Sequence, residues 1–302
     1  MTQGEKPREP LSHLTVRLAR SEADRLSAQR LRYRVFVEEL GADGPTVDHA
    51  ARIERDAFDP HADHLLLVDT RRPEETGDHV VGVYRLLTGE RALAGPGFYS
   101  AGEYDLAPLI RSGRKLLELG RSCVDPEYRG GPAMLLMWNA LADYVLARGI
   151  EILFGVASFH GTDVAALAQP LSWLHHHHLA PPELRVRALE NSYQHMDLIA
   201  PGALDGRAAK AAMPALIRAY LRLGGMVGEG AWIDHAFNTT DVCLIVDTAR
   251  MSARHRAFYT RGREPHPLTE SRAPLDGGAP EPERPAKEGR GGSGPRGGNP
   301  AS

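Results

Sequence analysis

Leu116-Leu-Glu-Leu-Gly-Arg-Ser-Cys-Val124 is an apolar segment that runs directly into the turn Asp125-Pro-Glu-Tyr-Arg-Gly-Gly-Pro132. The segment has the composition of a buried strand, yet it carries Glu118 and Arg121. Residues 133–148 follow with helical spacing of apolar side chains. A strand, a glycine loop and a helix commonly present backbone N–H groups to a phosphate-bearing ligand. Burying a charged side chain costs free energy unless the charge is paired with an opposite one or serves in binding or catalysis. We therefore expect this strand to line a functional site.

Composition limits the class of protein. The chain has 302 residues, 42% of them hydrophobic, and a net charge of −3. Residues 1–12 and 263–302 are poor in large apolar residues and are expected to be disordered, which leaves 13–262 as a single domain. The charge argues against broad nucleic-acid binding. The N-terminus lacks an apolar run and no segment approaches the ~18–20 apolar residues of a membrane span, so a cytoplasmic location is expected.

The order of predicted elements indicates a mixed sheet. Strands are predicted at 13–19, 64–69, 79–87, 116–124, 150–158, 226–233 and 242–246. Helices are predicted from Ser21 to about Leu40, at 133–148, from 161 to 174, at 207–223 and at 249–259, with loops at 43–63 and 89–112. The second and third strands are predicted to form an antiparallel hairpin. Hairpins followed by a strand–loop–helix–strand unit favour a mixed α/β or α+β sheet over a doubly wound one.

This order of elements resembles that of GNAT-type acyltransferases, in which the loop after the central strand cradles the pyrophosphate of coenzyme A. The family motif is Arg/Gln-x-x-Gly-x-Gly/Ala, whereas this chain has Arg129-Gly-Gly-Pro-Ala133, with Pro132 at a glycine position of the motif. Such a loop is less suited to coenzyme A and is compatible with the single phosphate of the phosphopantetheine arm of acyl carrier protein. The resemblance thus implies that Arg129, Gly130 and Gly131 meet a carrier-protein thioester as co-substrate, with no other cofactor.

Scattered polar residues resemble those of the acyl-homoserine-lactone synthases, which are GNAT-like and use acyl carrier protein. The shared pieces occur in the same order as Arg32-x-x-x-Phe36, Glu54-x-Asp56-x-x-Asp59, Gly82-x-x-Arg85-Leu86 and Glu118-x-x-Arg121. The tryptophan that those synthases carry shortly after the phenylalanine is missing here. This departure argues against S-adenosylmethionine as a substrate.

Longer blocks of the chain are similar to the L-ornithine Nα-acyltransferase family of ornithine-lipid synthesis. The matching blocks are residues 32–39, 63–68, 97–100, 103–106, 117–124, 153–159, 220–226 and 237–243. Together they span nearly the whole predicted domain. The resemblance implies transfer of a 3-hydroxyacyl group from acyl carrier protein to the α-amine of L-ornithine, which forms lyso-ornithine lipid.

Such a reaction is the aminolysis of a thioester, for which the amine must lose a proton. Glu118 is the candidate general base, directly or through a water, with a structural Glu118–Arg121 ion pair as the alternative. Arg85 and Arg121 are candidates to bind the ornithine carboxylate, because a guanidinium matches a carboxylate bidentately. Their alternative is a buried ion pair with Asp56 or Asp59.

Other residues receive supporting roles. Asp56 and Asp59 are candidates for the side-chain ammonium of ornithine, with loop capping as the alternative. Arg32 and Phe36 are expected to order the loop that closes on substrate, with core packing as the alternative for Phe36. Ser158, in the matched block 153–159, is grouped with the substrate-binding residues.

Several alternatives stay open. Cys123 shares a strand face with Arg121, so a covalent acyl-enzyme remains possible, although direct transfer is expected. His175-His-His-His178 is interpreted as a helix end, and no metal is predicted. Residues 207–223 are expected to pack on the core, with peripheral contact at the inner membrane as the alternative.

For the whole chain, the rival functions are acylation of another amine and a non-catalytic module. The other amines are glycine, lysine, glutamine and an autoinducer precursor. The module would bind an acyl carrier or a membrane.

Overall fold

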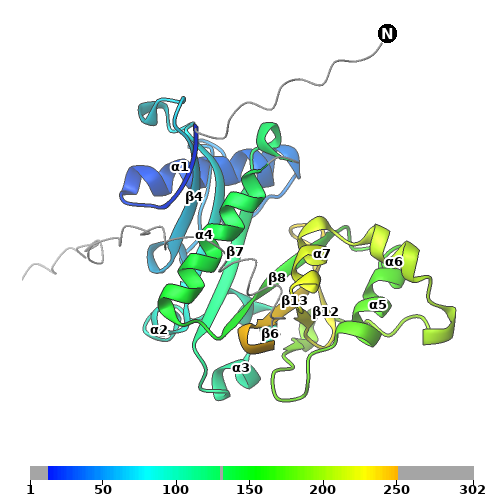
Figure 1. Cartoon of the computed structure of the whole chain (residues 1–302). Helices are drawn as coiled ribbons and strands as arrows, with labels where there is room; N and C mark the ends of the chain where they lie inside the picture. Colours follow the sequence, from blue (N-terminus) through cyan, green and yellow to red (C-terminus); the bar gives the residue numbers. More distant parts are fainter. Residues whose placement is uncertain (1–12, 130–131, 251–302) are drawn as a thin grey trace, which may run out of the picture. The chain divides into compact units, whose positions relative to one another are not determined.

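The structure is a computed structural model that describes residues 13–129 and 132–250 (Figure 1). The segments predicted to be disordered, 1–12 and 263–302, lie outside the described residues, as do most of the predicted helix 249–259 and the loop glycines Gly130 and Gly131. Within the described ranges, no helix combines the length and the apolar composition that crossing a membrane requires.

A mixed sheet forms the framework of the described residues, as the sequence predicts. Its strand order is β1-β4-β5-β7-β8-β13-β12-β10, with β11 paired to β13. The strands are β1 Leu14–Leu18, β4 Asp63–Asp69, β5 Val80–Thr88, β7 Leu116–Val124, β8 Ile152–His160, β10 Tyr193–Gln194, β11 Met226–Val227, β12 Ala231–Asp234 and β13 Thr239–Asp247. Two small ribbons join β2 Val47–Asp48 to β3 Ile53–Glu54, and β6 Tyr104–Asp105 to β9 Arg187–Ala188. The predicted hairpin is confirmed, because β4 pairs with β5 antiparallel.

Two helices cover opposite faces of the first half of the sheet (Figure 1). Alternate residues of β4 show this: Leu65 and Leu67 belong to the core that includes α4 (Ala133–Arg148), while Leu66 and Val68 belong to the core that includes α1 (Glu22–Arg32). Ser21 caps α1 by accepting from the Asp24 amide at 3.2 Å. Further helices are α2 Gly89–Leu93, α3 Ala107–Arg111, α5 Ala168–His178, α6 Gly206–Ala212 and α7 Ala215–Arg222.

Several predicted boundaries are wrong. The predicted helix 207–223 is two helices, because Pro214 lacks an amide hydrogen and α7 begins after it. The predicted helix to Leu40 changes at Tyr33 into a π-helix, Tyr33–Glu39. The predicted loops contain β2 and β3 in 43–63, and α2, β6 and α3 in 89–112. The helix predicted from residue 161 begins at Ala168, and the strand 226–233 is divided into β11 and β12.

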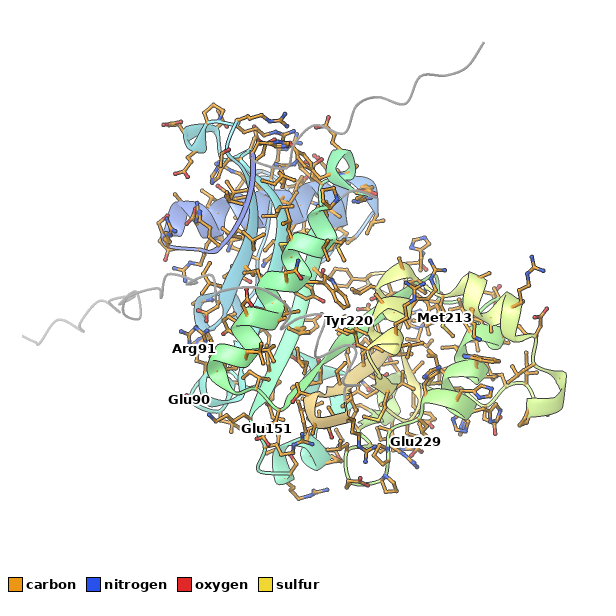
Figure 2. The ribbon with its side chains drawn as sticks, viewed as in Figure 1. Glu90, Arg91, Glu151, Met213, Tyr220 and Glu229 are labelled. Carbon is orange, nitrogen blue, oxygen red and sulfur yellow. The ribbon has the colours of Figure 1, made fainter. Side chains whose placement is uncertain are left out.

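The sheet parts between β7 and β8. These strands pair in parallel through Leu116, Leu117 and Glu118, whereas β8 pairs with β13 along its whole length. The register between β5 and β7 also shifts here, and Arg121 adopts a left-handed φ of 50°, a conformation that costs a non-glycine residue on the order of 1–3 kcal/mol. Tyr220 of α7 lies on the side facing α4 (Figure 2). Its hydroxyl is 2.5 Å from that of Tyr84 on β5.

Candidate active site

A cavity of about 370 Å³ lies where β7 and β8 part. Residues 119–122 of β7 and 156–158 of β8 line it, together with Phe36 of the π-helix and parts of β5 and β13. The charged residues in its wall are Arg85, Glu103, Glu118, Arg121, Asp234, Asp241 and Glu54. The cavity therefore joins the strand that carries Glu118 to residues from distant parts of the chain.

Glu118 is held by backbone amides. The side chain is buried, and its two carboxylate oxygens accept hydrogen bonds from the amides of Tyr99 at 2.9 Å and Ser100 at 2.7 Å. Burial raises the pKa of Glu118, although the two amides oppose that shift. A carboxylate with a raised pKa at a cavity wall suits a general base. In the described structure Glu118 does not pair with Arg121, which has other carboxylate partners.

Arg32 belongs to a buried ion network that forms part of the cavity wall and extends behind it. The network consists of Arg32, Arg85, Arg121, Glu54, Asp56 and Asp59, whose side chains keep at most 12% of their surface exposed. Arg32 donates from both terminal nitrogens to the Asp59 carboxylate at 2.7 Å, and its Nε lies 2.6 Å from the Glu54 carboxylate. Three cations balance three anions, so each buried charge has an opposite partner.

Arg85 and Arg121 are the network members that bring positive charge to the cavity. Arg85 donates to Asp56 at 2.5 Å and Asp59 at 3.0 Å, and Arg121 donates to Asp56 at 2.9 Å. Both guanidinium groups lie over the ring of Tyr99, at 5.6 Å and 4.5 Å from its centroid. These contacts fix the orientation of two guanidinium groups in the wall.

The structure brings part of the predicted set to the cavity. The lining contains Phe36, Arg85, Glu118, Arg121 and Ser158. Arg32, Asp56 and Asp59 stand behind this wall, and the nearby arginines hold the pKa values of both aspartates below their usual range.

Sequence reasoning missed a second group of carboxylates. Glu103 follows the turn Tyr99–Gly102, and Asp241 lies on β13 opposite Ser158 of β8. Both are buried and line the cavity with Asp234. The matched blocks 103–106 and 237–243 contained Glu103 and Asp241, but periodicity alone assigns them no role.

Cys123 is not part of the cavity lining. The thiol is free and buried, does not line the cavity, and burial raises its pKa to about 12. A thiol in that state is a poor nucleophile near neutral pH. The geometry therefore favours direct acyl transfer.

The loop after β7 is described up to Arg129. Its guanidinium donates to the Glu39 carboxylate at 2.5 and 2.7 Å and to the Val124 carbonyl at 2.9 Å. Pro132 precedes the first residue of α4. The predicted sequence of strand, loop and helix is confirmed, whereas the contact of the loop with a donor stays a prediction.

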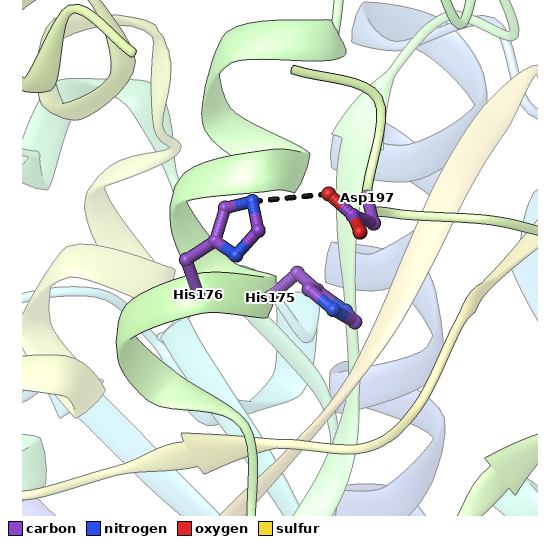
Figure 3. Close-up of side chains that lie close together, drawn as sticks. All are labelled: His175, His176 and Asp197. Atoms are coloured by element: carbon purple, nitrogen blue, oxygen red, sulfur yellow. Dashed lines mark ion pairs between the residues drawn. The ribbon is translucent and has the colours of Figure 1, made fainter. Parts of the chain in front are cut away.

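Three side chains outside the cavity have ligand atoms within 4.8 Å of one another, namely His175, His176 and Asp197 (Figure 3). His176 Nε2 lies 3.0 Å from the Asp197 carboxylate and 3.1 Å from the Ile199 carbonyl. The two histidines are adjacent on α5, so their side chains leave the helix in different directions. The ion pair accounts for the positions of His176 and Asp197, and the absence of a metal stays a prediction.

Comparison with known proteins shows which families the chain resembles. The acetyltransferase (GNAT) domain family matches residues 31–139. The L-ornithine N(alpha)-acyltransferase of Rhodobacter capsulatus is 65% identical over 252 residues, which are 83% of this chain and 96% of that protein. The protein of the same name from Brucella abortus is 46% identical over 251 residues, 82% of this chain and 89% of that protein. The solved structure of BjaI, a CoA-dependent acyl-homoserine lactone synthase, covers 82% of this chain and 87% of its own at 17% identity, with a TM-score of 0.46.

Proposed function

This chain belongs to the L-ornithine Nα-acyltransferase family of GNAT-fold N-acyltransferases, and we propose that it transfers a 3-hydroxyacyl group from acyl carrier protein to the α-amine of L-ornithine. The product would be lyso-ornithine lipid. The observation that carries the proposal is the buried carboxylate of Glu118 in the wall of a cavity that also presents Arg85 and Arg121.

The reaction needs a group that carries a proton from nitrogen to sulfur, and it needs no protein nucleophile. The amine nitrogen attacks the thioester carbonyl, the C–N bond forms, and the C–S bond breaks to release the phosphopantetheine thiol. Glu118 takes the proton that the nitrogen loses and returns it to the departing sulfur, so the overall change is thioester plus amine to amide plus thiol. Arg121 and Arg85 attract the substrate carboxylate and thereby orient its α-amine.

Two features support a carrier-bound acyl chain as the donor. Pro132 stands where the GNAT motif has a glycine. The cavity wall also contains Leu87, Leu216 and Phe237, and a small apolar hollow that shares Tyr84 and Leu119 with the cavity continues beside it. These apolar surfaces suit the acyl chain of the donor.

Because the product is amphiphilic, the proposal includes a cytoplasmic site of action with peripheral contact at the inner membrane. The apolar residues Ile217 and Tyr220 of α7 are buried in the core. Membrane contact would therefore rely on basic side chains such as Arg218 and Lys210 rather than on an apolar face.

The test is a reconstituted assay with the purified full chain. A 3-hydroxyacyl carrier protein and L-ornithine are incubated with the enzyme, and the amide is identified by mass spectrometry. Parallel reactions replace the donor by the matching acyl-coenzyme A and the amine by glycine, lysine or glutamine. Equal turnover of the coenzyme A thioester would contradict the donor assignment, and failure to acylate ornithine would contradict the proposal.

Glu118→Gln tests the base in the same assay. We expect kcat to fall by roughly 10²–10⁴-fold, the usual contribution of a general base. Glu90→Gln, an exposed position on α2 (Figure 2), is the matched control and should leave kcat unchanged. A Glu118→Gln enzyme with wild-type kcat would remove Glu118 from the mechanism.

A further inference from the structure

We propose that Glu103 and Asp241 form the subsite for the distal ammonium group of the amino-acid substrate, and so determine both the preference for a diamino acid and the choice of its α-amine. This inference rests on the proposed function, because it concerns the amine that enters the same cavity. It concerns carboxylates other than the two aspartates that the sequence suggested for this role.

Among the described residues, neither carboxylate has a hydrogen-bond partner for one of its oxygen atoms. These atoms are Oε2 of Glu103, which is 5% exposed, and Oδ1 of Asp241, which is 4% exposed. The other oxygen of Asp241 accepts from the Thr239 hydroxyl at 3.3 Å. Both residues line the cavity. A buried acceptor without a partner is costly, and a ligand donor in the cavity would remove that cost.

The charge around these carboxylates is unbalanced. In residues 13–129 and 132–250, no ion pair joins Glu103, Asp234 or Asp241 to a lysine or arginine, whereas every carboxylate of the ion network has an arginine. Asp234 adds a third carboxylate to this side of the wall, where its Oδ1 caps two backbone amides. Burial and the neighbouring carboxylates raise the pKa of Glu103, and burial raises that of Asp241. This side of the cavity therefore favours a cationic ligand.

The spacing favours an ammonium group over a metal ion. Among the described residues, the one group with three ligand atoms within 4.8 Å of one another is at His175, outside the cavity. Glu103, Asp234 and Asp241 therefore do not bring three ligand atoms within that distance of one another. An ammonium group has three N–H donors, and two of them would satisfy the open oxygens of Glu103 and Asp241.

One turn of the chain positions both ends of the amine site. The amides of Tyr99 and Ser100 hold Glu118, and the Ser100 carbonyl accepts from the Glu103 amide at 3.1 Å. Arg121 and Glu118 line the same cavity as Glu103. A diamino acid would then span from Glu118 at its α-amine to Glu103 at its distal nitrogen. The distal nitrogen, held as an ammonium, has no lone pair with which to attack the thioester.

The experiment compares L-ornithine with L-norvaline, which has the same carbon chain and no distal amine. Wild-type kcat/KM should be higher for ornithine than for norvaline. Glu103→Gln and Asp241→Asn should each lower the ornithine-to-norvaline ratio of kcat/KM by about 10–100-fold, because each variant loses one charge-assisted hydrogen bond. Norvaline turnover by the same variant is the internal reference, because a general loss of folded enzyme lowers both activities and leaves their ratio unchanged. Glu90→Gln again serves as the control.

A second measurement needs no variant. Butane-1,4-diamine should inhibit the wild-type enzyme more strongly than butylamine, which lacks the second ammonium group. The inference is overturned if amides form but the ornithine-to-norvaline ratio is the same in wild type and variants, or if the two amines inhibit equally. If no amino acid is acylated at all, the proposed function fails instead.

Discussion

Replacing Arg32 by methionine should destabilise the protein strongly although Arg32 does not line the cavity. The side chain is 0% exposed, and its loss leaves the carboxylates of Glu54 and Asp59 with one cation fewer in a buried setting. Removing one partner of a buried ion pair costs about 3–5 kcal/mol. The lower end, about 3 kcal/mol, is expected here, because Asp59 keeps Arg85 and Glu54 keeps Arg121.

Urea unfolding at pH 7 followed by circular dichroism measures this loss, provided that the slope of the free energy against urea concentration is unchanged. For a domain of this size, about 3 kcal/mol corresponds to a fall in Tm of roughly 6–12 °C. Arg32→Lys should give an intermediate loss, since an ammonium group cannot reproduce the bidentate contact with Asp59.

Arg72→Met is the matched control, because Arg72 pairs with the exposed Glu127 at 2.8 Å. Such surface pairs contribute about 0–1 kcal/mol. If Arg32→Met and Arg72→Met lose the same stability, the ion network does not stabilise the fold as argued.

Three further outcomes are expected. A methyl group at Gly155 would meet the Leu119 carbonyl oxygen at 2.2 Å. Gly155→Ala should therefore lower the free energy of unfolding by about 1–3 kcal/mol, measured by thermal unfolding, and should also lower kcat/KM. Gly202 has open space around it, so the control Gly202→Ala should change neither quantity. In the absence of substrate, folded Glu103 keeps a proton that the unfolded chain loses, because its folded pKa is raised, and a bound ammonium group would take the place of that proton. The stabilising contribution of Glu103 is complete below the unfolded pKa of about 4.3 and is lost as pH rises through the folded pKa. Urea titrations of the substrate-free protein from pH 5 to 9 should therefore show a steeper decline in the free energy of unfolding in wild type than in Glu103→Gln. Intact-mass spectra of enzyme mixed with acyl carrier thioester in the absence of amine should show no acyl adduct, and an adduct on Cys123 would contradict direct transfer.

The elements that follow local rules were predictable from the sequence. The alternation in β1, the apolar runs of β4 and β5, and the passage from β7 through a glycine loop into α4 all indicated the observed elements. The wrong prediction of one helix at 207–223 also has a local cause, since the presence of Pro214 indicates a break between α6 and α7. The π-helix at Tyr33–Glu39 could not be predicted in this way, because it departs from the regular hydrogen-bond pattern that sequence periodicity reports.

Sequence by itself determined which charged residues lie within apolar, strand-like segments. The long blocks that are similar to a known family indicated the family. The sequence left open which charges pair, because a partner is chosen by distance in space and not by separation along the chain. Tertiary structure decided that Arg32, Asp56 and Asp59 stand behind the cavity wall, and that the amides of Tyr99 and Ser100 hold Glu118.

The placement of Glu103 and Asp241 in one cavity is the clearest example of a site that only the tertiary structure reveals. One follows a short turn before β6 and the other lies on β13, and no local pattern relates them. They reach one cavity because β8 leaves β7 after Glu118 and pairs with β13 instead. The sequence thus determined the elements and their chemistry, whereas the long-range pairing of strands decided which side chains share a site.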